Sequence, residues 1–252
     1  SYRMMKTYPA YFHLSNAISY RNQYEYDTGN PLLEPCQTYY LNLTASYKWL
    51  YATLQYKRVK NESANICMPY NEETHPGVLL FGSANVATYN GYSLNLVAAP
   101  QIGCWRPQFT AYVSLSPTDG RNLGIKEYRK QPYFLFEWDN SFLFPNGWFL
   151  NIQADYHPVC RSGFAVFHTT GQVNARVSKS FLKDNAMTVA LTASDIFRTG
   201  NYYFHIYGIN SSVKKTIYRD FQRIGIQLSY KFNATKSKYK GTGAGQSEKS
   251  RL

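Results

Sequence analysis

The chain lacks any apolar run long enough to form a membrane-spanning helix. Such a helix needs about 18 or more consecutive apolar residues, and no run among the 252 residues approaches that length. The sequence also starts at Ser1 without an initiator Met or the charged and apolar regions of a signal peptide. We therefore expect a mature chain or a fragment. We favour a fragment, because residues 1–6 read like the end of a strand already under way.

Cysteine and histidine are few and dispersed. No Cys-x-x-Cys pair and no metal-ligand spacing occurs among the four cysteines and five histidines, and a zinc site needs clustered ligands. We expect no metal and no cofactor. Unpaired thiols are the default expectation, and the alternative is a disulfide between Cys67 and Cys160, which both fall in predicted long connections.

Signatures of a hydrolase are missing as well. No Gly-x-Ser-x-Gly elbow and no evident pairing of a histidine with a carboxylate stands out in the sequence. An enzyme of lipase or protease type would need such groups. The sequence therefore predicts no catalytic residues and no enzymatic activity.

Acidic residues are scarce: 15 Asp and Glu stand against 27 Lys and Arg, which gives a net charge of +12. The basic residues are scattered, and neither a recognition helix nor an RNA-binding signature accompanies them. We therefore expect no nucleic-acid partner. Acidic lipid head groups or anionic solutes are the expected counterparts of this charge.

What the chain has in abundance is strict alternation of apolar and polar residues, together with aromatics. Aromatic residues make up 17% of the chain, with 24 Tyr and 15 Phe. In residues 223–232 the even positions are Ile, Ile, Leu, Tyr and Phe, and the odd positions are Arg, Gly, Gln, Ser and Lys. A period of two gives a strand one apolar and one polar face. Aromatics at strand ends are typical of a barrel whose outer face meets lipid.

About ten stretches follow this pattern. Beyond residues 1–6, the predicted strands are 38–47, 50–59, 88–100, 106–116, 132–144, 147–156, 168–182, 186–198 and 216–232. Tight turns near residues 48–49, 103–105, 145–147 and 183–185 alternate with long connections at 61–83, 117–131, 157–167 and 199–215. An up-and-down membrane barrel sorts its connections in this way. A Greek-key sandwich does not, although a soluble eight-stranded barrel can resemble it.

The polar faces indicate a wet interior. They carry Glu137, Asp139, Asp155, Arg176, Arg223 and Lys231, which would be costly in a dry core. The sequence therefore predicts an all-β, antiparallel, up-and-down transmembrane barrel portion of about ten strands, belonging to a larger barrel in the outer membrane, with lipid as a partner.

The last strand resembles the assembly signal of bacterial outer-membrane barrels. That signal is a polar residue, a glycine, two alternating hydrophobic residues and a final aromatic. The matching positions are Arg223, Gly225, Leu228, Tyr230 and Phe232. An ordinary edge strand can alternate in the same way, but the glycine and the terminal phenylalanine raise the match above that pattern. The resemblance implies the barrel-assembly machinery as a partner.

Two further segments resemble TonB-dependent receptors. Residues 28–35 are similar to their Gly-Asn-Pro-x-Leu-x-Pro segment, and residues 194–197 (Ser-Asp-Ile-Phe) are similar to their Asn-Asp-Ile-Phe segment, with Ser in place of Asn. The ending, 228–240, resembles the Bacteroidota branch of outer-membrane β-barrels. The positions that carry the first segment are Gly29, Asn30, Pro31, Leu33 and Pro35.

The resemblance implies the C-terminal barrel portion of a TonB-dependent receptor that takes up a scarce nutrient. Such receptors have an N-terminal plug and a TonB-contacting box, which this sequence lacks; both would be partners through an upstream part. The long connections would meet the ligand, and their Tyr, Asn and charged residues suit a sugar or a chelate without identifying it. The alternative is a self-contained small barrel acting as a passive pore or a structural anchor.

The predicted domain boundary falls at the end of the last strand. Residues 1–232 are the barrel, and residues 233–252 form a flexible basic periplasmic tail. Within the tail, Gly241, Gly243 and Gly245 have the spacing of a phosphate loop. The apolar strand and the helix that such a loop requires are missing, so an extension is the preferred interpretation.

Overall fold

The computed structural model describes residues 1–125 and 131–232, and regular structure in them is almost entirely β. The predicted tail, 233–252, and part of the connection 117–131 lie outside the described residues. A short helix, α1 (Tyr11–Leu14), and three 3₁₀ turns, η1 (Arg121–Leu123), η2 (Pro145–Gly147) and η3 (Lys183–Asn185), complete the elements. Among the described residues, no helix combines the length and the apolar character needed to cross a membrane.

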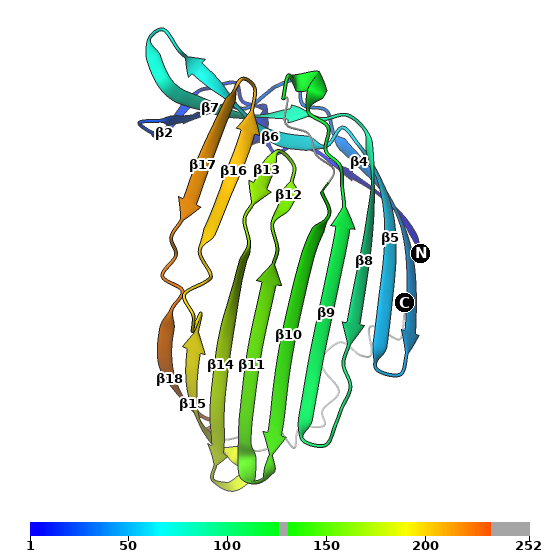
Figure 1. The fold of residues 1–252 in the computed structure, drawn as a ribbon, viewed down its shortest axis with the longest axis vertical. Coiled ribbons are helices and arrows are strands. Elements are labelled where there is room, and N and C mark those ends of the chain that lie inside the picture. Colours follow the sequence, from blue (N-terminus) through cyan, green and yellow to red (C-terminus); the bar gives the residue numbers. More distant parts are fainter. Residues whose placement is uncertain (126–130, 233–252) are drawn as a thin grey trace, which may run out of the picture.

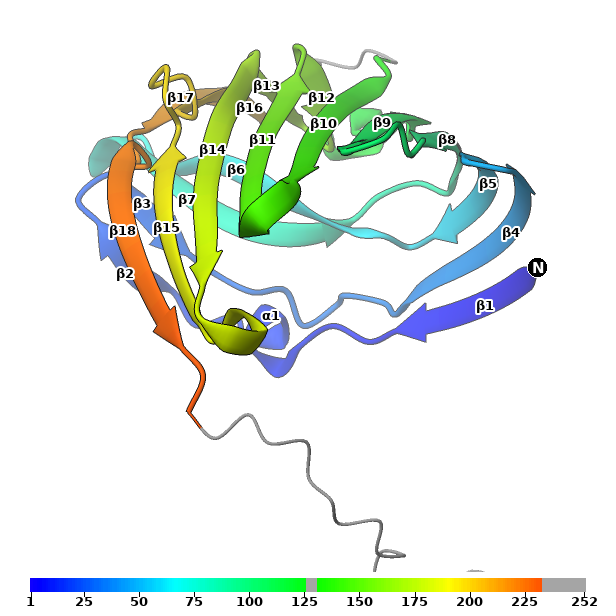
Figure 2. The same cartoon turned by 90° about the horizontal axis from the view of Figure 1, so that it is seen from below.

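Ten strands form one large curved sheet (Figures 1 and 2). In spatial order they are β1 (Tyr2–Thr7), β4 (Cys36–Tyr47), β5 (Leu50–Lys60), β8 (Tyr89–Ala98), β9 (Trp105–Leu115), β10 (Tyr133–Phe144), β11 (Trp148–His157), β14 (Thr170–Phe181), β15 (Met187–Ser194) and β18 (Arg223–Tyr230). Every neighbouring pair is antiparallel. The prediction of an all-β, antiparallel, up-and-down architecture with about ten strands is confirmed. No pairing within the described ranges joins β1 to β18, so both are open edges.

The tight turns at the lower end of this sheet are confirmed. Asn146 and Gly147 have φ values of 59° and 76°, and Asp184 and Asn185 have φ values of 57° and 52°. Asn, Asp and Gly tolerate this left-handed backbone better than other residues. Pro-Asn-Gly and Asp-Asn therefore reverse the chain over the shortest distance, and they hold the β10–β11 and β14–β15 pairs in register.

The long connections are more ordered than the sequence predicted. Residues 61–83 contain β6 (Ser63–Asn71) and most of β7 (His75–Asn85). Connections 157–167 and 199–215 contain further hairpins, made of β12 (Cys160–Ser162), β13 (Ala165–Phe167), β16 (Tyr202–Gly208) and β17 (Ser211–Ile217). The predicted last strand, 216–232, begins too early: the strand in the structure, β18, starts at Arg223. Residues 216–217 belong to the end of β17, and a turn in which Phe221 N–H donates to Arg219 O separates the two strands.

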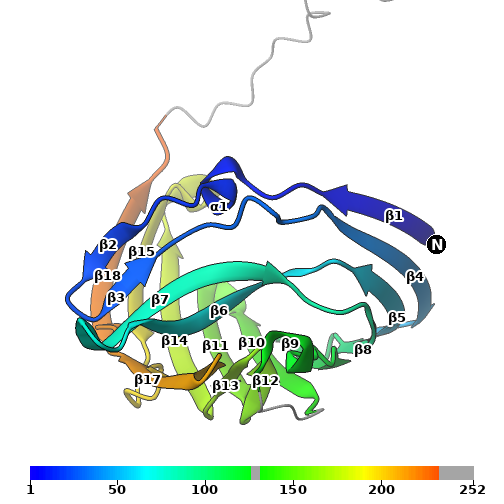
Figure 3. The same cartoon turned by 90° about the horizontal axis from the view of Figure 1, so that it is seen from above.

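These hairpins form a second region, which we call the cap. One four-stranded sheet has the order β2-β3-β7-β6, with β2 (Ser19–Asn22) and β3 (Glu25–Asp27), and the other has the order β12-β13-β16-β17. The first sheet crosses the upper end of the large sheet, and the second continues its wall upward (Figures 1 and 3). The backbone N–H of Ile209 donates to Cys67 O over 2.7 Å and joins the two cap sheets.

Among residues 1–125 and 131–232, the buried hydrophobic cluster lies at the cap. Ile66, Ala84, Val86, Ile125 and Phe164 are all buried and pack together there. The large sheet is built the other way round. Its apolar side chains point outward, and Leu54 and Ile226 are 51% and 80% exposed. Burial of apolar surface drives folding, so the cap satisfies this requirement internally while the large sheet needs an apolar surrounding.

Candidate functional site

The outward face of the large sheet is an apolar band with aromatic residues at both ends. Leu43, Leu54 and Leu94 stand opposite one another across three strands. Above this row the Tyr56 and Tyr92 rings lie 5.4 Å apart, and at the lower end the Trp105 and Phe142 rings stack at 6.2 Å. Aromatic belts that flank an apolar band mark the two interfaces of a membrane.

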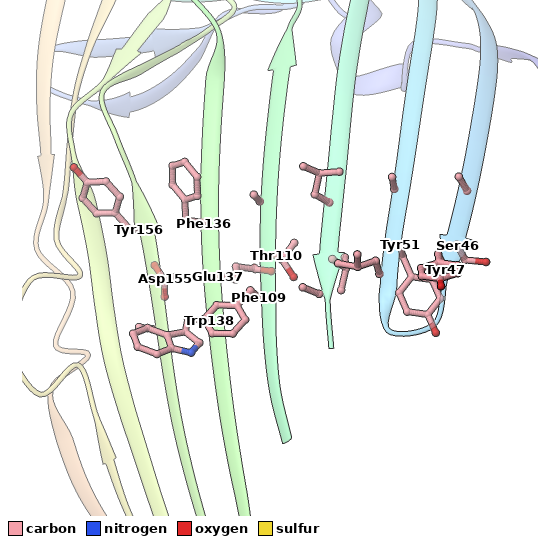
Figure 4. Close-up of a pocket in the computed structure, with 18 residues that line it drawn as sticks. Ser46, Tyr47, Tyr51, Phe109, Thr110, Phe136, Glu137, Trp138, Asp155 and Tyr156 are labelled. Carbon is pink, nitrogen blue, oxygen red and sulfur yellow. The ribbon is translucent and has the colours of Figure 1, made fainter. Parts of the chain in front are cut away.

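A shallow hollow of about 750 Å³ lies within this band (Figure 4). Its floor includes Ala45, Ala52 and Ala111, whose small side chains leave space between larger neighbours. Phe109 and Trp138 stack at 5.4 Å and form one wall. The hollow is almost wholly apolar and therefore belongs to the lipid-facing surface.

Asn140 and Lys179 are polar side chains in the outward register that make local contacts. Asn140 is 7% exposed and accepts a hydrogen bond from the Trp105 indole over 3.0 Å. Lys179 lies near the lower turns, where its ammonium group sits over the rings of Trp148 and Phe181 and donates to Asn146 O. A lysine at this level reaches the interface with its charge while its stem covers apolar surface. At these two positions the outward face thus stays compatible with lipid.

The opposite face of the large sheet is a polar wall rich in amides and carboxylates. Asp139 accepts hydrogen bonds from Asn151 Nδ2 at 2.7 Å and from Gln153 Nε2 at 2.8 Å. Arg176 donates to Gln227 Oε1 over 3.1 Å. The sequence placed Glu137, Asp139, Asp155, Arg176 and Arg223 on polar faces, and their strand registers agree with that placement.

Between this wall and the cap lies a cavity of about 680 Å³, which we call the vestibule. It combines aromatic rings with hydroxyl, amide and charged groups. The residues that line it are Lys57, Glu62, Ser63, Ala64, Asn65, Tyr89, Tyr112, Ser114, Ser116, Thr118, Gln131, Tyr133, Arg161, Ser162, Gly163, Phe164, Ala165, Phe167, Phe204 and Ile206. A pocket of this size and mixed lining is typical of a small-molecule site.

Hydrogen bonds and ring contacts hold the vestibule side chains in place. Tyr89 donates its hydroxyl to Glu62 over 2.7 Å, and the Lys57 ammonium lies 5.7 Å from the centre of the same tyrosine ring. The rings of Tyr112 and Tyr133 meet edge to face at 6.0 Å, and those of Phe167 and Phe204 stack at 5.3 Å. Two walls of the vestibule therefore present fixed ring pairs.

Sequence reasoning missed these aromatics as site residues. Tyr112 and Tyr133 occupy the polar register of β9 and β10, opposite in face to Phe109, Phe136 and Trp138. A tyrosine in the polar register of an otherwise alternating strand was the available signal. Phe167 and Phe204 lie in segments that the sequence predicted only as connections.

A charged cluster, which we call the latch, connects the two cap sheets. Glu25 on β3 forms an ion pair with Lys215 on β17, and Arg21 on β2 lies 2.6 Å from Asp27 and 3.4 Å from Glu25. Partial burial raises the pKa of the Glu25 carboxyl, but hydrogen bonds and charges from Lys215 and Arg21 outweigh burial and hold the pKa below its usual value of 4.5. The Glu25 carboxyl is therefore charged at neutral pH.

The residues of the predicted assembly signal lie along β18 and just beyond it. Gly225 sits where a Cβ would lie 3.1 Å from Thr192 Oγ1, and its carbonyl accepts the Thr192 hydroxyl over 3.2 Å. Leu228 is exposed on the outward face, and the Tyr230 and Phe232 rings meet at 4.6 Å. Arg223 faces the polar wall instead.

The receptor-like segment at 28–35 lies at a structural junction away from the vestibule lining. Gly29 N and Asn30 N donate to Ser15 O and His13 O over 2.7 and 2.6 Å, and a Cβ on Gly29 would lie 2.4 Å from Ser15 O. Asn30 Nδ2 donates to Ser83 O over 3.2 Å, and Leu33 is 7% exposed. The sequence expected a strand after this segment. β4 begins at Cys36, directly after Pro35.

The second receptor-like segment ends β15. Asp195 is 3% exposed, and its carboxylate accepts backbone N–H groups of Thr199 and Gly200 over 2.9 and 3.2 Å. Its own N–H donates to Asn174 Oδ1 over 2.9 Å. A buried carboxylate needs such donors. Asp195 therefore organises the bend from the large sheet into the cap.

All four cysteines are free thiols, so the alternative of a Cys67–Cys160 disulfide is not realised. Burial raises the pKa of the Cys67 and Cys160 thiols, and Cys67 also contacts the Ser211 hydroxyl at 3.7 Å.

The structure contains a histidine–carboxylate contact that the sequence analysis did not identify. His157 Nε2 lies 3.5 Å from Asp155 Oδ2. Within residues 1–125 and 131–232, no cluster of three or more metal-ligating side chains occurs.

Comparison with known proteins agrees with this geometry. A profile of the outer membrane protein beta-barrel family matches residues 1–230. No curated protein matches the chain. The family match covers most of the sequence, and the lipid-facing band, the aromatic belts and the polar wall are what such a barrel requires. The chain therefore belongs to the outer membrane protein beta-barrel family and resides in the outer membrane.

Proposed function

We propose that the chain is the C-terminal barrel portion of a TonB-dependent receptor that takes up a scarce nutrient from outside the cell. The observation that carries this proposal is the vestibule together with the polar wall. Tyr112 lines the vestibule and also, with Thr110 and Glu137, a second polar hollow on the wall. A solute bound beneath the cap would therefore meet a continuous polar surface inside the barrel.

The open edges support a larger barrel. β1 and β18 have no ladder partner on their outer sides within the described residues. Each unpaired backbone group in lipid costs several kcal/mol. Additional strands between β1 and β18 would remove this cost and enlarge the interior enough for a plug domain, through which TonB would act.

The orientation follows from the connection lengths. Outer-membrane barrels place short turns in the periplasm and long connections outside. The turns at residues 48–49 and 145–147 would thus face the periplasm, and the cap would face the exterior. The vestibule would then receive solutes from outside.

Uptake is tested in source cells with and without the gene that encodes this chain, grown on a panel of limiting iron chelates and carbohydrates. We expect a growth defect on at least one nutrient, reproduced when TonB is removed. Steady ion conductance of the purified protein in planar bilayers, with normal growth on every nutrient, would instead support a passive pore.

We further propose that Tyr230 and Phe232 are read by the barrel-assembly machinery. Their rings meet edge to face and are exposed at the end of an open edge strand. Tyr230→Ala or Phe232→Ala should lower the amount of inserted protein severalfold, measured by heat-modifiable mobility in outer-membrane fractions. Ser229→Ala, on the polar face of the same strand, is the matched control. Equal insertion of all three variants would refute this role.

A further inference from the structure

We infer that the vestibule binds a neutral oligosaccharide, an assignment that rests on the proposed function and specifies its ligand class. The inference starts from the two ring pairs, Tyr112–Tyr133 on the wall and Phe167–Phe204 on the cap. An aromatic face carries negative partial charge. The C–H faces of a sugar ring carry the opposite sign, so they pack favourably on such rings.

The polar lining suits hydroxyl groups. Ser63, Ser114, Ser116, Thr118 and Ser162 contribute hydroxyls, and each hydroxyl can both donate and accept a hydrogen bond. The amides of Asn65 and Gln131 add separate donors and acceptors. A sugar hydroxyl also donates and accepts, so the hydroxyl and amide groups of this lining can form hydrogen bonds with it.

The charged groups favour a neutral ligand over an anionic chelate. Lys57 lies over the Tyr89 ring, Arg161 lies 5.4 Å from the centre of the Tyr207 ring, and Glu62 accepts the Tyr89 hydroxyl. Each of these charged side chains thus contacts a tyrosine of the protein itself. An anionic ligand would have to draw Lys57 and Arg161 away from these rings.

The size of the cavity sets the length of the ligand. A volume of about 680 Å³ lies within the range of about 300–1,000 Å³ for small-molecule sites. It admits a short oligosaccharide and excludes a folded protein. One ring pair lies on β9 and β10 and the other on β13 and β16 above them, so neighbouring sugar units would contact different pairs.

The test is a glycan array that carries neutral and acidic oligosaccharides, probed with the labelled full-length protein in detergent. We expect at least one neutral oligosaccharide to bind, with affinity that changes less than about twofold between 0.1 and 1 M NaCl, because salt screens charge interactions alone. Tyr112→Ala should weaken binding about tenfold or more, through loss of ring contact. Tyr112→Phe should retain most of the affinity.

Tyr92→Ala is the matched control, since Tyr92 lies on the lipid-facing side and is 53% exposed. Equal amounts of folded variant in the outer membrane establish that Tyr112→Ala does not act through misfolding. The inference is overturned if the wild-type protein binds no glycan, binds only acidic glycans in a salt-sensitive way, or binds equally after Tyr112→Ala. Binding without TonB-dependent uptake would instead overturn the proposed function and leave the ligand class intact.

Discussion

The large sheet and the cap consist of the same kind of strand, yet they place their apolar residues in opposite environments. Ile226 on β18 is 80% exposed, whereas Ile66 on β6 is 7% exposed. Each isoleucine shares one face of its strand with the residues two positions away. The difference shows that alternation fixes only which residues share a face. Whether that face contacts lipid or protein depends on whether another part of the chain packs against it.

The consequences for stability differ as well. The cap buries Ile66, Val86 and Phe164 against one another and would keep this core in water. The large sheet keeps its outward face apolar and depends on the membrane for burial. The same kind of labelling or substitution should therefore have different effects in the cap and in the large sheet.

The largest difference between the cap and the lower turns of the large sheet should appear in surface labelling of intact cells, where a site either reacts or does not react. A single cysteine at Gly163, in the exposed turn between β12 and β13, should react with a membrane-impermeant maleimide. A cysteine at Asn146, in the lower turn, should not react until the outer membrane is opened. Both variants are made with the native cysteines replaced by serine. The opposite labelling pattern would invert the assignment of the two ends.

Phe164→Ala should produce the next largest effect. Phe164 is 5% exposed within the cap core, and removing a buried phenylalanine costs about 3–5 kcal/mol. The cost should appear as local unfolding of the cap, measured by hydrogen exchange at β6, β7 and β16. Exchange in β10 and β11 should be unchanged. Loss of protection throughout the large sheet would show that the two regions fold as one unit.

Leu54→Arg tests the lipid-facing side. Leu54 lies in the outward band between the aromatic belts, where an arginine costs about 2–4 kcal/mol at the bilayer midplane and less near the interfaces. The free energy of unfolding in lipid vesicles, measured by urea titration, should fall accordingly. Gln55→Arg, the next residue and on the polar wall, should cost much less. Equal costs would show that both faces meet similar surroundings.

Much of the large sheet was predictable because period-two alternation and turn chemistry are local signals. Lys48-Trp49 and Pro145-Asn146-Gly147 marked hairpins that the structure contains. The cap was not predictable in the same way. Pro158 has no N–H to continue a ladder and separates β11 of the large sheet from the short strand β12 of the cap. In addition, β3 pairs with β7 in parallel across a long stretch of sequence.

The vestibule was beyond sequence reasoning for a related reason. Tyr89, Tyr112 and Phe204 come from three separate strands, and only the curvature of the large sheet and the crossing of the cap bring them to one cavity. The receptor-like segments pointed elsewhere. Gly29 and Asp195 serve close backbone contacts and a buried bend, so family resemblance located structural junctions rather than the cavity.

The smallest expected effect concerns the latch between the two cap sheets. The pKa of Glu25 is lowered in the folded protein, so its contribution to stability is present above its usual pKa of 4.5 and is lost as pH falls through the folded value. A partly exposed ion pair contributes at most about 1 kcal/mol. Glu25→Gln should therefore weaken cap protection slightly at pH 7 and have no effect once the carboxyl is protonated in the wild type.

The measurement is hydrogen exchange of β17 against pH, compared with Glu72→Gln, since Glu72 is exposed in the β6–β7 hairpin. The wild type and Glu25→Gln should differ at pH 7 and converge only once pH falls below the pKa of Glu25 in the folded protein, which is itself lower than 4.5. Glu72→Gln should follow the wild type throughout. A difference that persists in acid would mean that Glu25 acts through packing rather than charge. Because the large sheet relies on lipid and the cap on its own contacts, β10 should not respond to either variant.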